Sequence, residues 1–326
     1  MSERLARSAG LIGLATLTSR VLGLVRDVVQ GAFFGTSAAA DAFVVATRLP
    51  TLLRDLFAEG AMSAAFVPIF TRYLTKDGRD AAWRLGSQVI NSLALITGIV
   101  VIVAIVFIDP LTRFYAAEYA DTPEKLRLTT DLARVNMPFL LLVAIAAALM
   151  GMLNSLRRFL IPALSPVTYN VVFILCMVIL VPVLQRMGLE PVMALSAGML
   201  LGGVAQIAIQ WPALRAEGYH HRWILDRHDT GLREILVLMG PATLGVAAAQ
   251  INLLVNTWLA TAEDGAASAL GYAFRLMYMP IGIFGVSVAT AVLPDLARQA
   301  ALAEHGRMRA TVSSGLRLML MLCVPA

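Results

Sequence analysis

The stretch LGSQVINSLALITGIVVIVAIVFI, residues 85–108, runs for 24 residues without a charged side chain. As a helix rising 1.5 Å per residue, it is long enough to cross the roughly 30 Å hydrocarbon core of a membrane. The whole chain has a similar character. Hydrophobic residues make up 59% and charged residues 14% of its 326 residues, and its mean hydropathy is +0.76. Soluble domains are about 45–50% apolar and about 25% charged. The sequence therefore predicts an all-α polytopic membrane protein and excludes a soluble one.

Hydropathy along the chain predicts about nine membrane-spanning helices. The second contains Pro50 and Gly60, which predict a kink or a break. The ninth covers only about 14 residues before the chain ends, too few to complete a crossing. We therefore expect further helices to follow. The predicted spans are 8–33, 40–70, 85–108, 130–153, 162–184, 191–213, 233–260, 268–297 and 313 to the end.

The basic residues predict the orientation of the chain. Fifteen Lys and Arg residues lie in the N-terminal segment and in the loops after spans 2, 4, 6 and 8, whereas four lie in the alternate loops. Cytoplasmic loops carry such an excess. We therefore predict a cytoplasmic N-terminus. The same distribution accounts for the net charge of +5 without a nucleic-acid partner.

The order of spans and loops predicts the domain organisation. Spans 1–2 and 7–8 show a weak internal similarity, and repeated halves around a central site are common in transporters. We expect a first lobe at 1–213 with spans 1–6, a cytoplasmic amphipathic linker at 214–232, and the start of a second lobe at 233–326 with spans 7–9. Within span 6, Gly198 and Gly202 lie four residues apart, which predicts close helix packing.

Several arginines lie inside predicted spans, where an arginine near the bilayer centre costs roughly 2.5–3.5 kcal/mol. Arg134 and Arg317 lie near span ends and can extend to the interface. Four others, facing lipid, would together cost on the order of 10 kcal/mol. They must therefore face water, a partner or a ligand. These four are Arg20, Arg26, Arg54 and Arg275.

Polar side chains recur every three or four residues on spans 1 and 2, so each span has one polar helical face. Such faces predict the walls of a hydrated cavity inside a helix bundle. On span 1 the polar face comprises Thr16, Ser19, Arg20, Gly23, Arg26, Asp27 and Gln30. On span 2 it comprises Asp41, Arg48, Thr51, Asp55 and Glu59, with Arg54 beside it.

Two interpretations of these charges stay open. The acids of spans 1 and 2 can neutralise the arginines as structural ion pairs. Alternatively, the arginines bind an anion. Span 8 favours the second interpretation, because it supplies no neighbouring acid to Arg275, which lies between Phe274 and Tyr278. A guanidinium group suits diphosphate, since its planar fork forms two parallel charge-assisted hydrogen bonds.

The sequence contains no motif of an enzyme. It has no GxxxxGK[ST] loop for nucleotide phosphates and no Ser/His/Asp constellation, so we predict a transporter without a cofactor or metal. The three histidines of the linker, His220, His221 and His228, lack a further ligand pattern. With Trp223 they favour a segment at the membrane interface over a metal site.

The segment SRVLGLVRD, residues 19–27, resembles the MurJ/MviN family of lipid II flippases. The resemblance extends over essentially the whole chain. It implies a two-lobed helical fold of the multidrug/oligosaccharidyl-lipid/polysaccharide exporter superfamily, with a C-terminally incomplete second lobe here. The further matching positions are 41–43, 49–54, 57–61, 66–69, 154, 162, 240–241, 272–276 and 293–294.

The resemblance also implies a function. The family flips lipid II, the undecaprenyl-pyrophosphate-linked peptidoglycan precursor, from the cytoplasmic to the periplasmic leaflet of the bacterial inner membrane by alternating access. The implied substrate-binding residues are Arg20, Arg26, Asp27, Arg54 and Arg275. The expected cavity ion pairs involve Asp41, Asp55, Glu59 and Arg48. The family commonly has an acid where this chain has Phe274.

The energy source and the partners are further expectations. Export of an anion can be coupled to the membrane potential or to a monovalent ion. Besides lipid II, we expect contacts with membrane lipids and with cell-wall synthesis proteins. Three alternatives remain: a flippase for another lipid-linked glycan, a cation-coupled drug exporter of the same fold, and a membrane scaffold with structural ion pairs.

Overall fold

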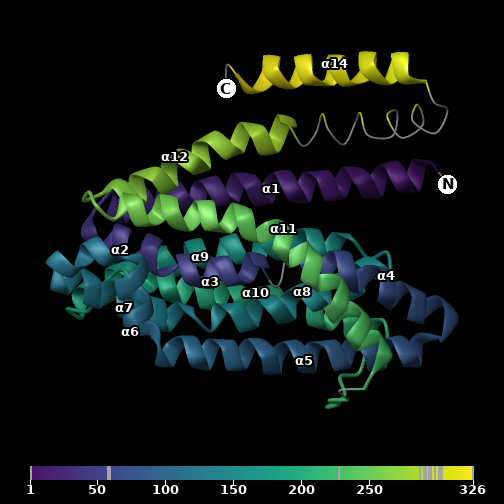
Figure 1. Cartoon of the computed structure of the whole chain (residues 1–326), viewed down its shortest axis with the longest axis horizontal. Helices are drawn as coiled ribbons and strands as arrows, with labels where there is room; N and C mark the ends of the chain where they lie inside the picture. The colour runs from purple at the N-terminus through teal and green to yellow at the C-terminus, as the bar shows by residue number, and fades with distance from the viewer. Residues whose placement is uncertain are drawn as a thin grey trace. The chain divides into compact units, whose positions relative to one another are not determined.

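The computed structural model of the chain describes residues 2–56, 60–226, 228–285 and 304–324, and positions 288, 292, 296 and 299. All regular structure in this described part is helical (Figure 1). In chain order the elements are α1 (Ser2–Phe34), α2 (Ala38–Ala46), α3 (Arg48–Arg54), α4 (Gly60–Lys76), α5 (Arg79–Val106), α6 (Ile108–Tyr115), the 3₁₀ helix η2 (Ala117–Asp121), α7 (Pro123–Asn136), α8 (Phe139–Ser155), α9 (Leu160–Arg186), α10 (Met193–Ala216), α11 (Thr230–Ala260), α12 (Ala266–Pro280), the π-helical turn η3 (Ile281–Gly285) and α14 (His305–Cys323).

Four helical segments among the described residues are long and apolar enough to cross a membrane. They coincide with the predicted spans 3 to 6. Within the second of them the backbone changes course at Pro138, which has no N–H to donate, so α7 and α8 are separate helices. The four segments are Arg79–Val106, Pro123–Ser155, Leu160–Arg186 and Met193–Ala216.

The predicted second span is broken, as its proline and glycine indicated. It consists of α2, α3 and α4, with Thr47 between the first two. Ser37 caps α2, because its Oγ accepts a hydrogen bond from the N–H of Ala40 at 3.3 Å. Before it, α1 ends at Phe34, and the following Gly35 has a φ of 54°, in the left-handed region that favours glycine.

The chain divides into two compact units, Met1–Ser268 and Ala269–Ala326. In the first unit, α9 packs between α1 and α10, α8 packs against α4, α5 and α10, and α2 packs on α7. The lobe boundary expected at 214–232 stays a prediction. That segment includes the end of α10 and the start of α11, and its described residues between these two helices form no helix of their own.

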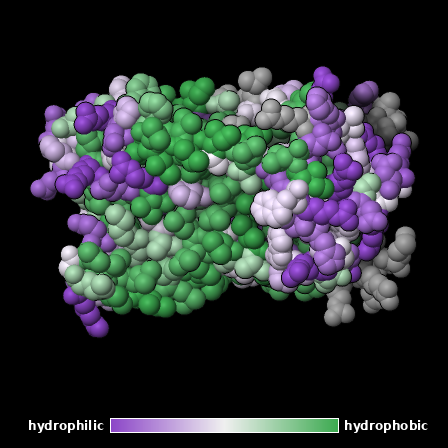
Figure 2. Space-filling view, turned by 90° about the horizontal axis from the view of Figure 1, so that it is seen from below, coloured by the Kyte–Doolittle hydropathy of each residue, from purple (hydrophilic) through white to green (hydrophobic). Residues whose placement is uncertain are grey.

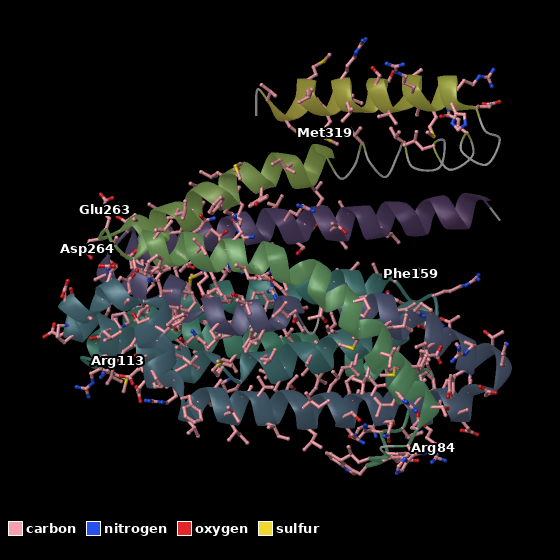
Figure 3. All side chains as sticks on the ribbon, in the orientation of Figure 1. Arg84, Arg113, Phe159, Glu263, Asp264 and Met319 are labelled. Carbon is pink, nitrogen blue, oxygen red and sulfur yellow. The ribbon has the colours of Figure 1, made fainter. Side chains whose placement is uncertain are left out.

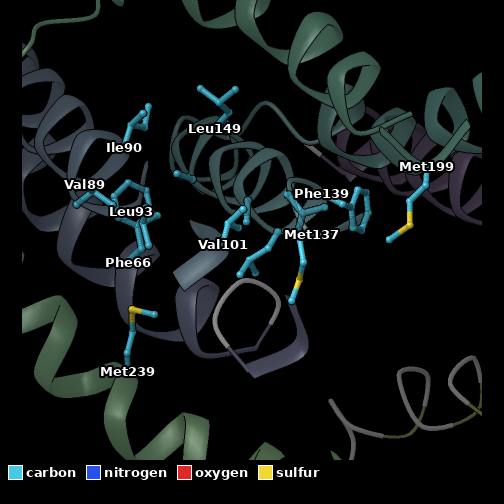
Figure 4. Packing of buried hydrophobic residues seen from close by; sticks show 14 of the residues in the cluster. Phe66, Val89, Ile90, Leu93, Val101, Met137, Phe139, Leu149, Met199 and Met239 are labelled. Atoms are coloured by element: carbon cyan, nitrogen blue, oxygen red, sulfur yellow. The ribbon is translucent and has the colours of Figure 1, made fainter. Parts of the chain in front are cut away.

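The interior of the first unit is apolar and closely packed. Figure 4 shows side chains from α4, α5, α8, α10 and α11 in a single buried cluster. Phe66, Leu149 and Leu140 at its centre are fully buried. Lipid tails are as apolar as these side chains, so the hydrophobic effect does not drive the helices together inside a membrane. Close van der Waals contact between the side chains holds them together instead. The labelled members include Val89, Ile90, Leu93, Val101, Met137, Phe139, Met199 and Met239.

Helix α10 packs closely against α9 at the two predicted glycines. A Cβ at Gly202 would lie 2.7 Å from the ring of Tyr169, and a Cβ at Gly198 would lie 3.2 Å from the ring of Phe173. Only glycine allows α9 and α10 to approach this closely. The packing prediction is therefore confirmed.

The surface has the pattern of a membrane protein. On the face that includes α5, hydrophobic residues form a broad band and hydrophilic residues gather at its two ends (Figure 2). Exposed aliphatic side chains of α5, such as Ile99 and Ile102, contribute to the apolar surface. A lipid bilayer accepts such a band, whereas water would not.

Candidate functional site

Arg26 lies on α1 and is held by polar groups from two helices. Its Nε and Nη2 donate to Oδ1 of the neighbouring Asp27 at 3.1 and 2.9 Å. Its Nη1 donates to Oδ1 of Asn170 on α9 at 3.3 Å. Asn170 in turn donates to the carbonyl oxygen of Ser19 at 3.2 Å. The guanidinium group therefore links the polar face of α1 to α9.

Two aromatic rings complete the surroundings of Arg26. Its guanidinium carbon lies 5.9 Å from the ring centre of Tyr169 and 5.3 Å from that of Phe173, within cation–π range. The side chains of Arg26 and Asp27 each keep 14% of their surface exposed. The pair is thus largely enclosed, and a small part of each side chain stays accessible.

Arg20 is half-buried on α1, six residues before Arg26. It makes no hydrogen bond or ion pair with any residue that the structure describes. Its positive charge is therefore not balanced by a direct contact within this part of the chain.

Arg54, at the end of α3, repeats the arrangement of Arg26. Its Nε and Nη2 donate to Oδ1 of Asp55 at 2.9 and 2.7 Å. The other oxygen of Asp55 accepts a hydrogen bond from Nε2 of Gln250 on α11 at 2.9 Å. The side chains of Arg54 and Asp55 are 29% and 21% exposed. Both described pairs thus join an arginine to the acid that follows it directly.

Asp41 has a different role from the one expected. The sequence placed it among the acids that neutralise the arginines, but its carboxylate pairs with Lys125 of α7. It also accepts hydrogen bonds from the N–H of Gly265 at 2.7 Å and from the N–H and Oγ of Ser268 at 2.9 and 2.7 Å. These donors lie at the start of α12, where an anion is favoured by unpaired N–H groups. Asp41 therefore caps a helix.

Lys125 is one of the four basic residues that the predicted topology places in the alternate loops, and its side chain is buried. Besides Asp41, it bonds Oδ1 of Asp264 at 2.7 Å. Its ammonium group lowers the pKa of the Asp264 carboxyl through a hydrogen bond and through charge attraction. The ammonium also lies 4.2 Å from the ring centre of Tyr119. One buried lysine thus joins α2, α7 and the α11–α12 connection.

The remaining predicted residues are not brought to these pairs by any described contact. Arg48 has its Nε buried without a hydrogen-bond partner in the described part of the chain. Glu59 lies outside the described residues. Arg275 is exposed on α12 in the second compact unit, next to the stacked rings of Phe274 and Tyr278, whose centres are 6.0 Å apart. A single site that includes Arg275 stays a prediction.

Sequence reasoning missed Asn170 and Gln250, the two amides that hold Arg26 and Asp55. Each is a strongly polar side chain inside an otherwise apolar span. Because such groups need a partner in a membrane, that position alone was a usable signal. The position of a polar residue in a span does not predict which helix supplies its partner.

The chain was compared with known families and proteins. A family model described as lipid II flippase MurJ matches residues 31–326. The chain is 35% identical over 334 residues to a "Probable lipid II flippase MurJ" of Vibrio cholerae, covering 100% of this chain and 63% of that protein. It is 34% identical over 317 residues to the "Lipid II flippase MurJ" of Burkholderia cenocepacia, covering 95% and 60%. The chain thus spans about three fifths of the length of these curated relatives.

Solved structures show the same fold. A "Lipid II flippase MurJ, inward closed conformation" superposes with a TM-score of 0.74 at 25% identity, covering 96% of this chain and 63% of that one. An inward-facing multidrug resistance transporter of the MATE family gives a TM-score of 0.71 at 12% identity, a likeness of fold alone. The predicted all-α polytopic transporter fold is therefore confirmed. Since the family model covers nearly the whole sequence, the chain belongs to the lipid II flippase MurJ family.

Proposed function

We propose that the chain is the larger part of a flippase that moves lipid II from the cytoplasmic to the periplasmic leaflet of the bacterial inner membrane. The N-terminus lies in the cytoplasm. Residues 1–213 form the first lobe and 233–326 begin the second. Arg20, Arg26, Arg54 and Arg275 bind the pyrophosphate of the substrate. The chain performs transport and no chemical step.

The observation that carries this proposal is the pairing of Arg26 with Asp27 and of Arg54 with Asp55 inside apolar helices. In each pair, two guanidinium nitrogens share one carboxylate oxygen. A phosphate group offers the same geometry and more charge, so it can replace the carboxylate without leaving the arginine unpaired. The acids then keep the empty site from repelling itself.

Transport follows from exchanging these partners as the protein changes conformation. The pyrophosphate displaces the acids when the site faces the cytoplasm, and the acids reclaim the arginines when the site faces the other side. Moving about two negative charges outward across a negative-inside membrane gains roughly 4–5 kcal/mol per 100 mV, if no other ion moves. The membrane potential, or a coupled monovalent ion, can therefore drive the direction.

The test is the thermal stability of the purified full-length protein with and without lipid II. A ligand that binds only the folded state raises the unfolding temperature. We expect a rise in the wild type that is lost in Arg26→Ala and in Arg54→Ala. Arg113→Ala, an exposed arginine of α6, should keep it. An equal rise in unfolding temperature in all four proteins would mean that Arg26 and Arg54 form structural ion pairs and do not bind the substrate.

Three further ligands separate the alternatives. Undecaprenyl pyrophosphate without sugar should stabilise the protein through the same arginines, and a lipid-linked glycan of another pathway measures sugar specificity. A cationic drug should give no rise, because arginines repel it. Stabilisation by the drug and none by lipid II would instead support a cation-coupled drug exporter.

A further inference from the structure

The segment between α10 and α11 runs along α5, a membrane-spanning helix, instead of extending away from it. We call residues 217–226 the strap; it crosses the end of α5 in Figure 1. At the start of α5, Nη1 of Arg79 donates to the carbonyl of Glu217 at 3.1 Å. Twelve residues later, Asn91 donates to the carbonyls of Arg222 and Ile224 at 2.8 and 3.0 Å. The strap therefore follows α5 for roughly 18 Å.

Polar side chains of α5 fix the backbone of the strap. Gln88 donates to the carbonyl of Asp226 at 2.6 Å. Ser87 accepts a hydrogen bond from the N–H of Arg222 at 3.2 Å. Asn91 and these two are polar residues near the start of the uncharged stretch 85–108. Left in lipid without partners they would be costly. The strap gives each of them at least one hydrogen-bond partner, and they hold it in place.

An aromatic side chain anchors the strap in the protein interior. Tyr219 is fully buried, with its ring centre 5.4 Å from that of Trp83 and 6.0 Å from that of Trp211. Its hydroxyl lies 3.1 Å from Oγ of Ser87. Because both ring contacts and hydrogen bonds fix it, the strap has a defined orientation.

The same orientation points other side chains outward. Trp223 is 89% exposed and Leu225 is 58% exposed. Neighbouring Arg222 is exposed, as is Arg84 on α5, which Figure 3 labels at this end of the helix. Neither guanidinium group forms a hydrogen bond or ion pair within the described part of the chain.

The outward residues lie where the lipid-facing surface of α5 begins. Asn91, Leu95 and Ile99 are spaced four apart and so share one face of the helix. The strap covers Asn91, whereas Leu95 and Ile99 are exposed apolar residues. An exposed tryptophan and leucine beside two arginines, at the edge of an apolar surface, form the pattern of a membrane-interface anchor. Lipid covers this edge better than a soluble protein would.

We propose that the strap anchors the protein to anionic lipid: Trp223 and Leu225 enter the boundary between headgroups and acyl chains, and Arg84 and Arg222 bind the headgroup phosphate. The proposal does not rest on the substrate site, because none of these four residues belongs to it. It assigns a lipid-binding role to a connection between the proposed lobes. The lipid composition of the leaflet then acts directly on that connection.

The first test places Trp223 in the bilayer. The protein is reconstituted in vesicles of phosphatidylcholine and phosphatidylglycerol, with and without bromine on the upper acyl chain. Subtracting the emission of Trp223→Phe from that of the wild type isolates this residue. We expect the difference emission to be quenched by brominated lipid and shielded from aqueous acrylamide. The reverse pattern would place Trp223 in water and overturn the anchor.

The second test measures the headgroup contact. Detergent-solubilised protein is titrated with fluorescent phosphatidylglycerol or phosphatidylcholine. We expect Arg84→Ala and Arg222→Ala each to weaken phosphatidylglycerol binding roughly fivefold, in line with the attraction of one basic residue to an anionic surface, with phosphatidylcholine binding unchanged. Arg113→Ala, an exposed arginine beside Phe114, serves as the matched control and should change neither affinity.

The variants remove exposed side chains, so their unfolding temperatures should equal that of the wild type, and this is measured alongside. Unchanged phosphatidylglycerol affinity in both arginine variants would refute the phosphate contact. An equal loss for both lipids would also refute it, because the effect would then not depend on headgroup charge.

Discussion

Lys125 and Asp41 form an ion pair in the protein interior, with Nζ 3.0 Å from Oδ2 and the two side chains 3% and 0% exposed. The pair joins α7 to α2, and through Ser268 it reaches the first turn of α12. Every charge in the cluster is satisfied by a partner of opposite sign or by an N–H group. Removing Asp41 therefore leaves Lys125 with Asp264 alone, and removing Lys125 leaves the buried Asp41 carboxylate without a cation.

We predict that Asp41→Asn and Lys125→Met each destabilise the protein by about 3–5 kcal/mol, the usual cost of leaving one partner of a buried pair uncompensated. The double variant should lose less than the sum of the single losses. Thermal unfolding in detergent measures all three. Asp264→Asn is the control. The Asp264 carboxylate bonds the same lysine, but its side chain is 92% exposed, so this variant should lose little stability. Fully additive losses would contradict the coupling.

The second prediction concerns the contact between α9 and α10. In Gly202→Ala the new Cβ would lie 2.7 Å from the Tyr169 ring and 3.2 Å from its backbone oxygen. The helices must separate, at a cost of about 1–3 kcal/mol. Gly98→Ala on α5 adds the same atom where nothing lies within 4 Å, and it should be neutral or slightly stabilising. The difference in unfolding temperature between the two variants checks this; equal values would contradict it.

The sequence predicted the helices of the membrane region well, because length and apolar composition are enough to identify a span. Residues 85–106 of the uncharged stretch lie within α5, and the proline and glycine of the second span indicated its breaks. The pairs Arg26–Asp27 and Arg54–Asp55 were also within reach of the sequence, since each joins adjacent residues.

The parts that the sequence did not predict depend on contacts between distant segments. Lys125 counts among the four basic residues in the alternate loops, and its burial depends on Asp41, 84 positions earlier. Asn91 lies in the uncharged stretch 85–108, whose hydropathy does not single it out. Only the structure brings the strap to it, because hydropathy contains no information about which backbone a side chain will meet.

The third prediction tests the geometry around Arg26. Arg26→Lys keeps the charge, but one ammonium group cannot give a phosphate two parallel hydrogen bonds while also bonding Asn170. A hydrogen bond to a charged group contributes roughly 1.5–3 kcal/mol, so lipid II affinity should fall about tenfold or more. Lipid II titrations of the purified full-length protein measure this. Arg134 of α7 is an ion-paired arginine with a 43% exposed side chain. Its Arg134→Lys variant should bind lipid II with the affinity of the wild type. Equal affinities in all three would mean that charge alone matters at Arg26.

The last prediction is a pH dependence located in the strap. Burial lowers the pKa of His221, whose Nδ1 lies 3.0 Å from the hydroxyl of Tyr219. Because the folded-state pKa is below the unfolded value of about 6.5, the unfolded chain binds more protons at mildly acidic pH. Stability is therefore full above about pH 6.5 and falls as pH drops through the folded-state pKa. Comparing unfolding temperatures at about pH 7.5 and pH 5, His221→Asn should reduce the drop. His220→Asn, which removes the exposed neighbouring imidazole, should leave it intact; a drop equal in all three proteins would assign the effect to other groups.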